Sequence, residues 1–468
     1  MSEEKTQGQL LAEEILYKGM DGTELFSEEE YRKAEEFSEK YKKFLSTAKT
    51  EREAVAYAIN LLERAGYKPF KCGTRYEAGE KIYLNNRNKS LIFATMGKRP
   101  LSEGVRIMAS HIDSPRIDLK PHPLMEDNDL AYLRTHYYGG IKKFHWPTLP
   151  LALHGVVCRK DGTSVTVTIG EDPNDPVFCI TDLLPHLASE QEKKTASKVF
   201  DAEKFHILIG SLPFKDDKAS DKVKLNMMRI FHEKYGIVEG DFLSAELTMV
   251  PAGPARDVGI DRSMIGSYGH DDRVCAFTSM MAAIDVESPE LTHVTVLADK
   301  EEIGSDGNTG MKSAFLEYFL EDLAEPFGIP VRTVLSNSKC FSADVNCAFD
   351  PTYPDVTEKS NTSLLNHGVV ITKYTGSGGK AGTNDASAEY MAWVRALLDK
   401  SDVLWQTGEL GKVDVGGGGT VAKFIAELNV DTVDLGVPVL SMHAPFEIVS
   451  KIDVYSTYRA FAAFAGKE

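Results

Sequence analysis

The sequence contains little cysteine, and what there is lacks a pattern. Its six cysteines are scattered over 468 residues, and no two of them form a CxxC pair. Disulfide scaffolds and structural thiolate zinc sites both need cysteines at short, repeated spacings. We therefore expect free thiols in a reducing compartment, and a cytoplasmic protein.

Long apolar runs and an excess of positive charge are also missing. No stretch approaches the ~18 consecutive apolar residues of a membrane helix, and the segment MSEEKTQGQLLAEE lacks the apolar centre of a signal peptide. The formal net charge is -17, which argues against nucleic acid or an anionic membrane surface as a partner. Two glycine-rich runs, at 376–382 and 415–420, lack the strand–GxGxxG–helix context of a dinucleotide site, so we interpret both as loops.

The chain is long enough for two domains and apolar enough for a sizeable core. Hydrophobic residues make up 42% of it, and its length exceeds the size at which a single core stops growing. Helical periodicity runs from 27 to 66. Ser27 and Glu30 are placed as a capping box, and Gly66 is placed as an end signal.

Strands and helices then alternate along much of the chain. Short β-branched runs lie at 81–97 and 105–115. After residue 270 we predict, in order, a helix, a strand, a helix and a strand, at 271–286, 293–299, 311–324 and 331–337. Such alternation is typical of an α/β fold. We expect a layered α/β/α domain with a largely parallel central sheet.

The segment from about 121 to 252 breaks this alternation. It contains short strands, such as those at 149–159 and 164–170, and many turn residues. The α/β pattern stops before it and resumes after it. We therefore predict a discontinuous α/β domain of residues 1–120 and 253–468, interrupted by an inserted β-rich domain of residues 121–252.

Histidines and carboxylates recur where strands are predicted to end or helices to begin. Each has an ordinary interpretation when taken alone: a solvated acidic turn, a hydrogen-bonded core histidine or a helix cap. Together they fall where α/β sheets place their ligands, near the carboxyl ends of strands. The set is His111 and Asp113, Asp271 and Asp272, Glu301 and Glu302, Asp344 and His443.

Two histidines, two aspartates and one glutamate are enough to hold a pair of divalent ions about 3.5–4 Å apart with one bridging carboxylate. A site of this kind without cysteine is more typical of catalytic than of structural zinc. The pattern therefore favours a catalytic metal site over a structural one.

The order of the motifs resembles one family. SHxDSP, DDR at a helix start, EEIGS, SADxxxAxxPxY and SMHxxxE occur in this order. The sequence is similar over essentially its whole length to the metallo-aminopeptidase family of aspartyl aminopeptidase and vacuolar aminopeptidase I. The resemblance implies hydrolysis of the N-terminal residue from peptides by a two-metal-activated water, with zinc most expected and cobalt or manganese as alternatives.

The resemblance also implies roles for individual residues. His111 and Asp344 would bind one ion, Glu302 and His443 the other, and Asp271 would bridge them, with Asp272 beside it. Asp113 would orient His111, and Glu301 would be the general base. His186, within LLPHLA of the insert, would reach into a neighbouring subunit's active site, or it is simply a packed or surface histidine.

The family further implies an assembly that acts on short peptides. Dimers would form through the inserted domain, and six dimers would close into a tetrahedral dodecamer. Two segments depart from the aspartyl aminopeptidase pattern, YYGGIKKFHWPTLPLALHG and VNCAFDPTYPD. A preference for acidic N-terminal residues is therefore left open. The alternatives are a metal-dependent deacylase or carboxypeptidase on the same scaffold, and a non-catalytic assembly scaffold.

Overall fold

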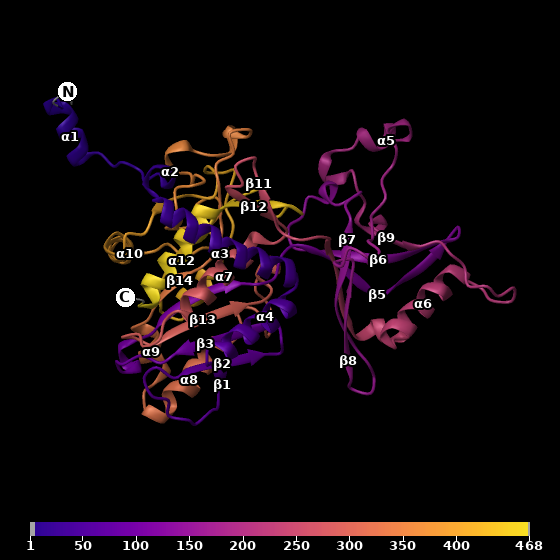
Figure 1. The fold of residues 1–468 in the computed structure, drawn as a ribbon, viewed down its shortest axis with the longest axis horizontal. Coiled ribbons are helices and arrows are strands. Elements are labelled where there is room, and N and C mark those ends of the chain that lie inside the picture. Colours follow the sequence, from indigo (N-terminus) through magenta and orange to yellow (C-terminus); the bar gives the residue numbers. More distant parts are fainter. Residues whose placement is uncertain (1–4, 467–468) are drawn as a thin grey trace.

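The computed structural model describes residues 5–466 and shows two bodies side by side (Figure 1). The larger body is built on a nine-stranded sheet. Its strands, in spatial order, are β1 (Lys68–Pro69), β2 (Lys81–Asn86), β3 (Ser90–Thr95), β13 (His293–Ala298), β4 (Arg106–His111), β14 (Lys339–Ser342), β18 (Asp431–Gly436), β16 (Val369–Thr372) and β17 (Trp405–Thr407). The four central strands β13, β4, β14 and β18 are parallel to one another. Their carboxyl ends therefore meet at one edge of the sheet.

Helices cover both faces of this sheet. One face packs against α3 (Glu28–Thr47), α4 (Glu51–Arg64), α7 (His270–Ile284), α10 (Ala388–Lys400) and α12 (Lys451–Ala465). The other packs against α8 (Phe315–Ala324), α9 (Val331–Ser336) and α11 (Ala422–Ala426). Strand β4 shows the alternation that two apolar layers require, since Met108 lies in the first core and Ile107 and Ala109 in the second. The predicted α/β/α layering is confirmed.

Two local predictions need correction. The periodic segment 27–66 forms two helices, because Thr50 opens α4 with a second capping box; Ser27 caps α3 as expected. The strand predicted at 331–337 is wrong, because that segment forms the helix α9 after Pro330. Its apolar run is short enough to suit either structure, and packing of Val334 and Leu335 against the second core accompanies the helix.

The smaller body is a six-stranded antiparallel sheet with one longer helix. Its strands, in spatial order, are β8 (Ser164–Ile169), β7 (Leu151–Cys158), β10 (Ala245–Pro251), β5 (Arg116–Asp127), β6 (Leu130–Tyr138) and β9 (Ile207–Gly210). The helices are α5 (Ser189–Glu192) and α6 (Lys222–Tyr235), of which α6 was not expected. A separate apolar cluster around Trp146, Leu153 and Met249 fills this body. The dimerising role of segment 121–252 stays a prediction.

A third, small sheet lies beside the large one. It comprises β11 (Arg256–Val258), β12 (Met264–Ser267), β20 (Glu447–Ser450), β19 (Pro438–Leu440) and β15 (Asn346–Cys347). The helices α1 (Gln7–Ile15) and α2 (Gly22–Leu25) precede the large body, and α1 extends away from it (Figure 1). Between residues 5 and 466, none of the helices combines the length and the apolar character needed to cross a bilayer.

Candidate metal centre

The predicted ligand residues gather at the carboxyl edge of the central strands. His111 is the last residue of β4, and Asp344 follows β14. The 3-10 turn η7 (Glu301–Ile303) carries both glutamates directly after β13. Asp271 lies in the first turn of α7, and His443 lies between β19 and β20. The large sheet and the small third sheet therefore both contribute.

Asp271 faces two histidines at once. Its Oδ1 lies 3.1 Å from His111 Nε2, and its Oδ2 lies 3.1 Å from His443 Nε2. Asp344 Oδ1 is 3.8 Å from His111 Nε2, and Glu302 Oε2 is 3.6 Å from His443 Nε2. Two clusters of ligand atoms result, one of His111, Asp271 and Asp344 and one of Asp271, Glu302 and His443. Asp271 is the member they share.

The N-capping interpretation of Asp271 does not fit this geometry. The helix α7 has Gly269 at its N-cap with no side-chain cap hydrogen bond, and Asp271 and Asp272 have non-helical backbone angles. Asp272 is fully buried next to Asp271. Its Oδ2 accepts a hydrogen bond from the backbone N–H of His111 at 3.3 Å. Asp272 therefore holds the strand that carries His111.

The residues present fit divalent cations. Glu302 Oε1 and Asp272 Oδ1 are buried without a hydrogen-bond partner, and a buried acceptor of this kind is costly unless a cation or proton satisfies it. The donor atoms are imidazole nitrogens and carboxylate oxygens, with no thiolate among them. Such a set suits catalytic zinc and also accepts cobalt or manganese.

The pKa shifts of the centre also indicate that its carboxylates lack enough positive charge nearby. Burial, reinforced by the charges of Asp271 and Asp113, raises the pKa of Glu301 to about 7. Burial and the charge of Asp271 raise the pKa of Glu302 well above its usual value. Although burial opposes a charged imidazole, hydrogen bonding to Asp271 and the charge of Glu302 raise the pKa of His443 to about 10. Carboxylates outnumber cationic groups here, so the centre attracts positive charge.

Asp113 connects the first histidine to the turn that carries the two glutamates. Its Oδ1 accepts the backbone N–H of Glu301 at 3.1 Å, and its Oδ2 accepts that of Glu302 at 3.2 Å. Nδ1 of His111 lies 3.0 Å from the backbone carbonyl oxygen of Asp113 and 3.4 Å from its Oδ1. The carboxylate thus holds the tight turn, which directs two neighbouring glutamates toward one centre.

Three residues that contact the candidate ligands or Asp113 were missed in the sequence. Glu447, fully buried, accepts the backbone N–H of His443 at 2.6 Å and that of Asp271 at 3.1 Å. The only sequence signal for Glu447 was its position as the last residue of the motif SMHxxxE. The backbone carbonyl of Gly140 lies 2.9 Å from His443 Nδ1, and Tyr138 Oη donates to Asp113 Oδ2 at 2.8 Å. The contact from Gly140 is made by its backbone carbonyl, which every residue type has, so the sequence contains no signal for it.

His186 does not reach the centre within one chain. It lies in the exposed turn Pro185–Leu187 of the smaller body. The adjoining helix α5 lies at the top of that body in Figure 1, separate from the large sheet. A role in a neighbouring subunit stays a prediction.

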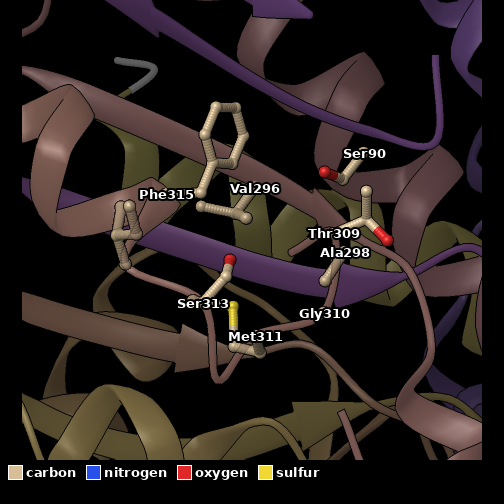
Figure 2. Close-up of a pocket in the computed structure, with 9 residues that line it drawn as sticks. Ser90, Val296, Ala298, Thr309, Gly310, Met311, Ser313 and Phe315 are labelled. Atoms are coloured by element: carbon tan, nitrogen blue, oxygen red, sulfur yellow. The ribbon is translucent and has the colours of Figure 1, made fainter. Parts of the chain in front are cut away.

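A small pocket is lined by residues of β13 and of segment 309–316, together with Ser90, and by none of these candidate ligands. Figure 2 shows its lining of small and apolar side chains, among them Val296, Met311 and Phe315. Its lining residues include no histidine, cysteine or carboxylate. The pocket therefore offers no ligands for a metal ion.

The chain as a whole is similar to several known proteins. The model of the aminopeptidase I zinc metalloprotease family (M18) matches residues 44–465. A probable M18 family aminopeptidase 1 of Clostridium acetobutylicum is 53% identical over 434 residues, covering 91% of this chain and 93% of the relative. The crystal structure of an M18 family aminopeptidase from Thermotoga maritima superposes with a TM-score of 0.92 at 42% identity, covering 97% of this chain and 100% of that one.

A more distant structure shares the fold. The mApe1 dodecamer of S. cerevisiae has a TM-score of 0.74 at 24% identity, covering 92% of this chain and 95% of that one. At this identity the likeness supports the architecture alone.

Proposed function

Because this chain belongs to the M18 family of aminopeptidase I zinc metalloproteases, we propose that it removes N-terminal residues from peptides with a water activated by two metal ions. The observation that carries the two-ion proposal is the position of Asp271, whose two carboxylate oxygens face different histidines at 3.1 Å each. A carboxylate so placed is suited to bridge two ions.

Five side chains hold the ions in this proposal. His111 and Asp344 serve one position, Glu302 and His443 serve the other, and Asp271 serves both. Bound divalent ions supply Lewis acidity and lower the pKa of a water toward neutrality. The donor set is compatible with zinc, cobalt or manganese, and the family points to zinc.

Glu301 is the proposed general base. Its Oε2 lies 4.0 Å from His111 Nε2, yet it belongs to neither cluster of ligand atoms. Its side chain is 18% exposed, compared with 3% for Glu302. A carboxylate that borders the ligands without joining them can accept a proton from water and pass it to the departing amine. Asp113 keeps Glu301 in place through its backbone N–H.

The surplus of carboxylates suits a substrate with a free amino terminus, since an ammonium group gains from a negatively charged recess. The preferred side chain is not assigned, because the two segments that depart from the aspartyl aminopeptidase pattern leave it open. Short peptides are the proposed substrates. A cytoplasmic location accords with the six free thiols of the described chain.

The proposed assembly is a dodecamer built from dimers that form through segment 121–252. This proposal follows from the family resemblance, and the S. cerevisiae protein that shares the fold is solved as a dodecamer. His186 is then proposed to enter the active site of the adjoining subunit. Light scattering coupled to an activity assay tests both ideas. A fully active monomer would contradict them, and co-assembled His186→Ala and Glu301→Gln subunits are expected to restore part of the activity.

A substrate panel tests the reaction itself. Aminoacyl amides and short peptides with a free amine are expected to be hydrolysed by the metal-loaded protein, and the same peptides with a blocked N-terminus are not. Cleavage of N-blocked peptides instead would favour a deacylase or carboxypeptidase. Metal analysis of the purified protein, with two ions expected per chain, separates both enzymes from a non-catalytic scaffold.

A further inference from the structure

A short corner of the smaller body reaches both ends of the metal centre. The corner consists of Tyr138, Gly139 and Gly140, at the end of β6. β6 lies in the six-stranded sheet, whereas the ligands come from the large sheet and the third sheet. The corner is therefore the point at which the smaller body enters the site.

Tyr138 acts through Asp113, next to His111, on the turn that carries Glu301 and Glu302. Its hydroxyl donates to Asp113 Oδ2 at 2.8 Å. The same carboxylate accepts the backbone N–H groups of Glu301 and Glu302. A donor to a buried carboxylate strengthens and directs that carboxylate's other contacts. Tyr138 therefore fixes Asp113, and Asp113 fixes the turn of the two glutamates.

Gly140 acts on the opposite end. Its carbonyl oxygen is 2.9 Å from His443 Nδ1, so the ring donates there and leaves Nε2 free to face Asp271. A second hydrogen bond of this kind fixes the tautomer and orientation of a ligand histidine. A Cβ on Gly140 would lie 3.2 Å from His443 Nδ1, and one on Gly139 would lie 3.3 Å from Glu302 Cβ. The close approach explains why both positions lack a side chain.

The smaller body in turn holds the tyrosine ring. The guanidinium of Arg116 lies over the Tyr138 ring, 4.1 Å from its centroid. Arg116 is buried and ion-paired with Glu51 of α4 at 2.9 Å and with Asp118 at 2.8 Å. Arg116 thus restricts the Tyr138 ring at the junction of the two bodies. A tyrosine on the surface would rotate freely.

We propose that Tyr138 and Gly140 are positioning residues for the metal centre, Tyr138 through Asp113 and Gly140 through His443, so that the placement of the smaller body sets the geometry of both ends. This inference rests on the proposed two-ion function. It adds that the segment between the ligands His111 and Asp271 in the chain is required for the site and does not merely cover it.

Tyr138→Phe is the first test, with Tyr137→Phe as the matched control. Both variants keep the ring and lose one hydroxyl, but Tyr137 is 41% exposed on the same strand. Loss of a group that orients a ligand typically costs about 10–100-fold in metal affinity or activity. We expect Tyr138→Phe to lose zinc to a competing chelator about 10-fold more readily, and to change the absorption spectrum of the cobalt-loaded protein. We also expect kcat to fall with little change in KM.

Gly140→Ala is the second test, with Gly240→Ala as its control. Gly240 lies in the same body, and nothing stands within 4 Å of the position where its Cβ would be. Gly140→Ala is expected to displace the His443 ring and to weaken the binding of one of the two ions, while Gly240→Ala behaves as the wild type.

The outcomes separate this inference from the proposed function. If wild-type protein binds no metal, or does not cleave free-amine peptides, the proposed function fails. If the wild type is active but Tyr138→Phe and Gly140→Ala match their controls in chelator resistance, cobalt spectrum and kcat, the positioning roles are wrong. A fall in thermal stability alone, with these three readouts unchanged, would likewise contradict them.

Discussion

The two ends of the proposed metal centre are built differently. At one end, the side chain of His111 is 1% exposed and ends a central strand of the large sheet. At the other, the side chain of His443 is 37% exposed and lies on a connection between two short strands, with φ of +64°. His111 itself is placed by a strand in a sheet covered on both faces. The second end needs the Gly140 carbonyl and the Glu447 carboxylate to hold it.

This difference teaches where precision in such a site comes from. A ligand at the end of a packed strand is placed by the core and needs few extra contacts. A ligand on a connection has more freedom, so hydrogen bonds from other elements must replace the missing packing. Water also reaches the His443 end more easily. We therefore expect the two ends to respond unequally to mutation and to metal removal.

Removal of Asp271, which both ends share, should abolish the difference between the His111 end and the His443 end. Asp271→Ala deprives both ends of a carboxylate, so we expect metal binding to be lost or greatly reduced at both positions and activity to be undetectable. Metal analysis after gel filtration, combined with a peptidase assay, measures this. If the variant retains two ions, Asp271 serves only the structure of the first turn of α7.

Glu301→Gln should leave both ends intact and still inactivate the enzyme. The amide cannot accept a proton, and general acid–base groups typically contribute about 10²–10⁴-fold to the rate. We expect kcat to fall within this range while the metal content stays that of the wild type. A metal-replete variant with near-normal kcat would exclude Glu301 as the base.

His111→Ala and His443→Ala should show directly that the two ends differ in stability and in metal binding. Each variant is expected to lose one ion. His111→Ala should also lower the melting temperature, because it leaves a cavity and unpaired carboxylates in a buried site, whereas His443→Ala should lower it less. Chelator treatment of the wild type is expected to remove the ion at the His443 end first. Equal melting temperatures and a single phase of metal loss would show that the ends are equivalent.

The smallest expected effect concerns the junction that places the smaller body. His154 of β7 contacts Glu53 of α4 at 2.8 Å and Glu171 at 2.9 Å, and Lys49 contacts Glu171 at 2.7 Å. Burial opposes the imidazolium, but hydrogen bonds to Glu171 and Glu53 raise the pKa of His154 above its usual value of 6.5.

A raised pKa in the folded state sets the sign of the pH dependence. The stabilisation by His154 is complete below about pH 6.5 and is lost as the pH rises through the higher pKa of the folded protein. A melting-temperature series of the metal-loaded protein against pH, compared with His154→Gln, measures it. We expect the advantage of the wild type over the variant to shrink as the pH rises. If the difference in melting temperature between the wild type and His154→Gln does not change with pH, His154 is not a charged group that stabilises the folded protein.

The sequence allowed the architecture to be predicted, and it placed the candidate ligands at one edge of the sheet, for a physical reason. Candidates such as His111 and Asp344 follow β-branched runs, and the carboxyl ends of parallel strands meet at one edge. The segment 331–337 was misassigned because a short apolar run suits a strand or a helix equally, and tertiary packing decides. Gly140 was not predicted, because its contribution is a backbone carbonyl that any residue type possesses. The role proposed for His186 requires a second subunit, which lies beyond the fold of one chain.

The order of segments along the chain has a consequence for biosynthesis. Strand β4 ends at His111, but its sheet neighbours β13 and β14 begin at His293 and Lys339. The six-stranded sheet is complete by Pro251. At synthesis rates of about 5–20 residues per second, β4 waits roughly 10–40 s for its first partner on the ribosome. The smaller body can therefore fold while the nascent chain still lacks the central strands of the large sheet, and the proposed metal centre is complete only after His443 has emerged.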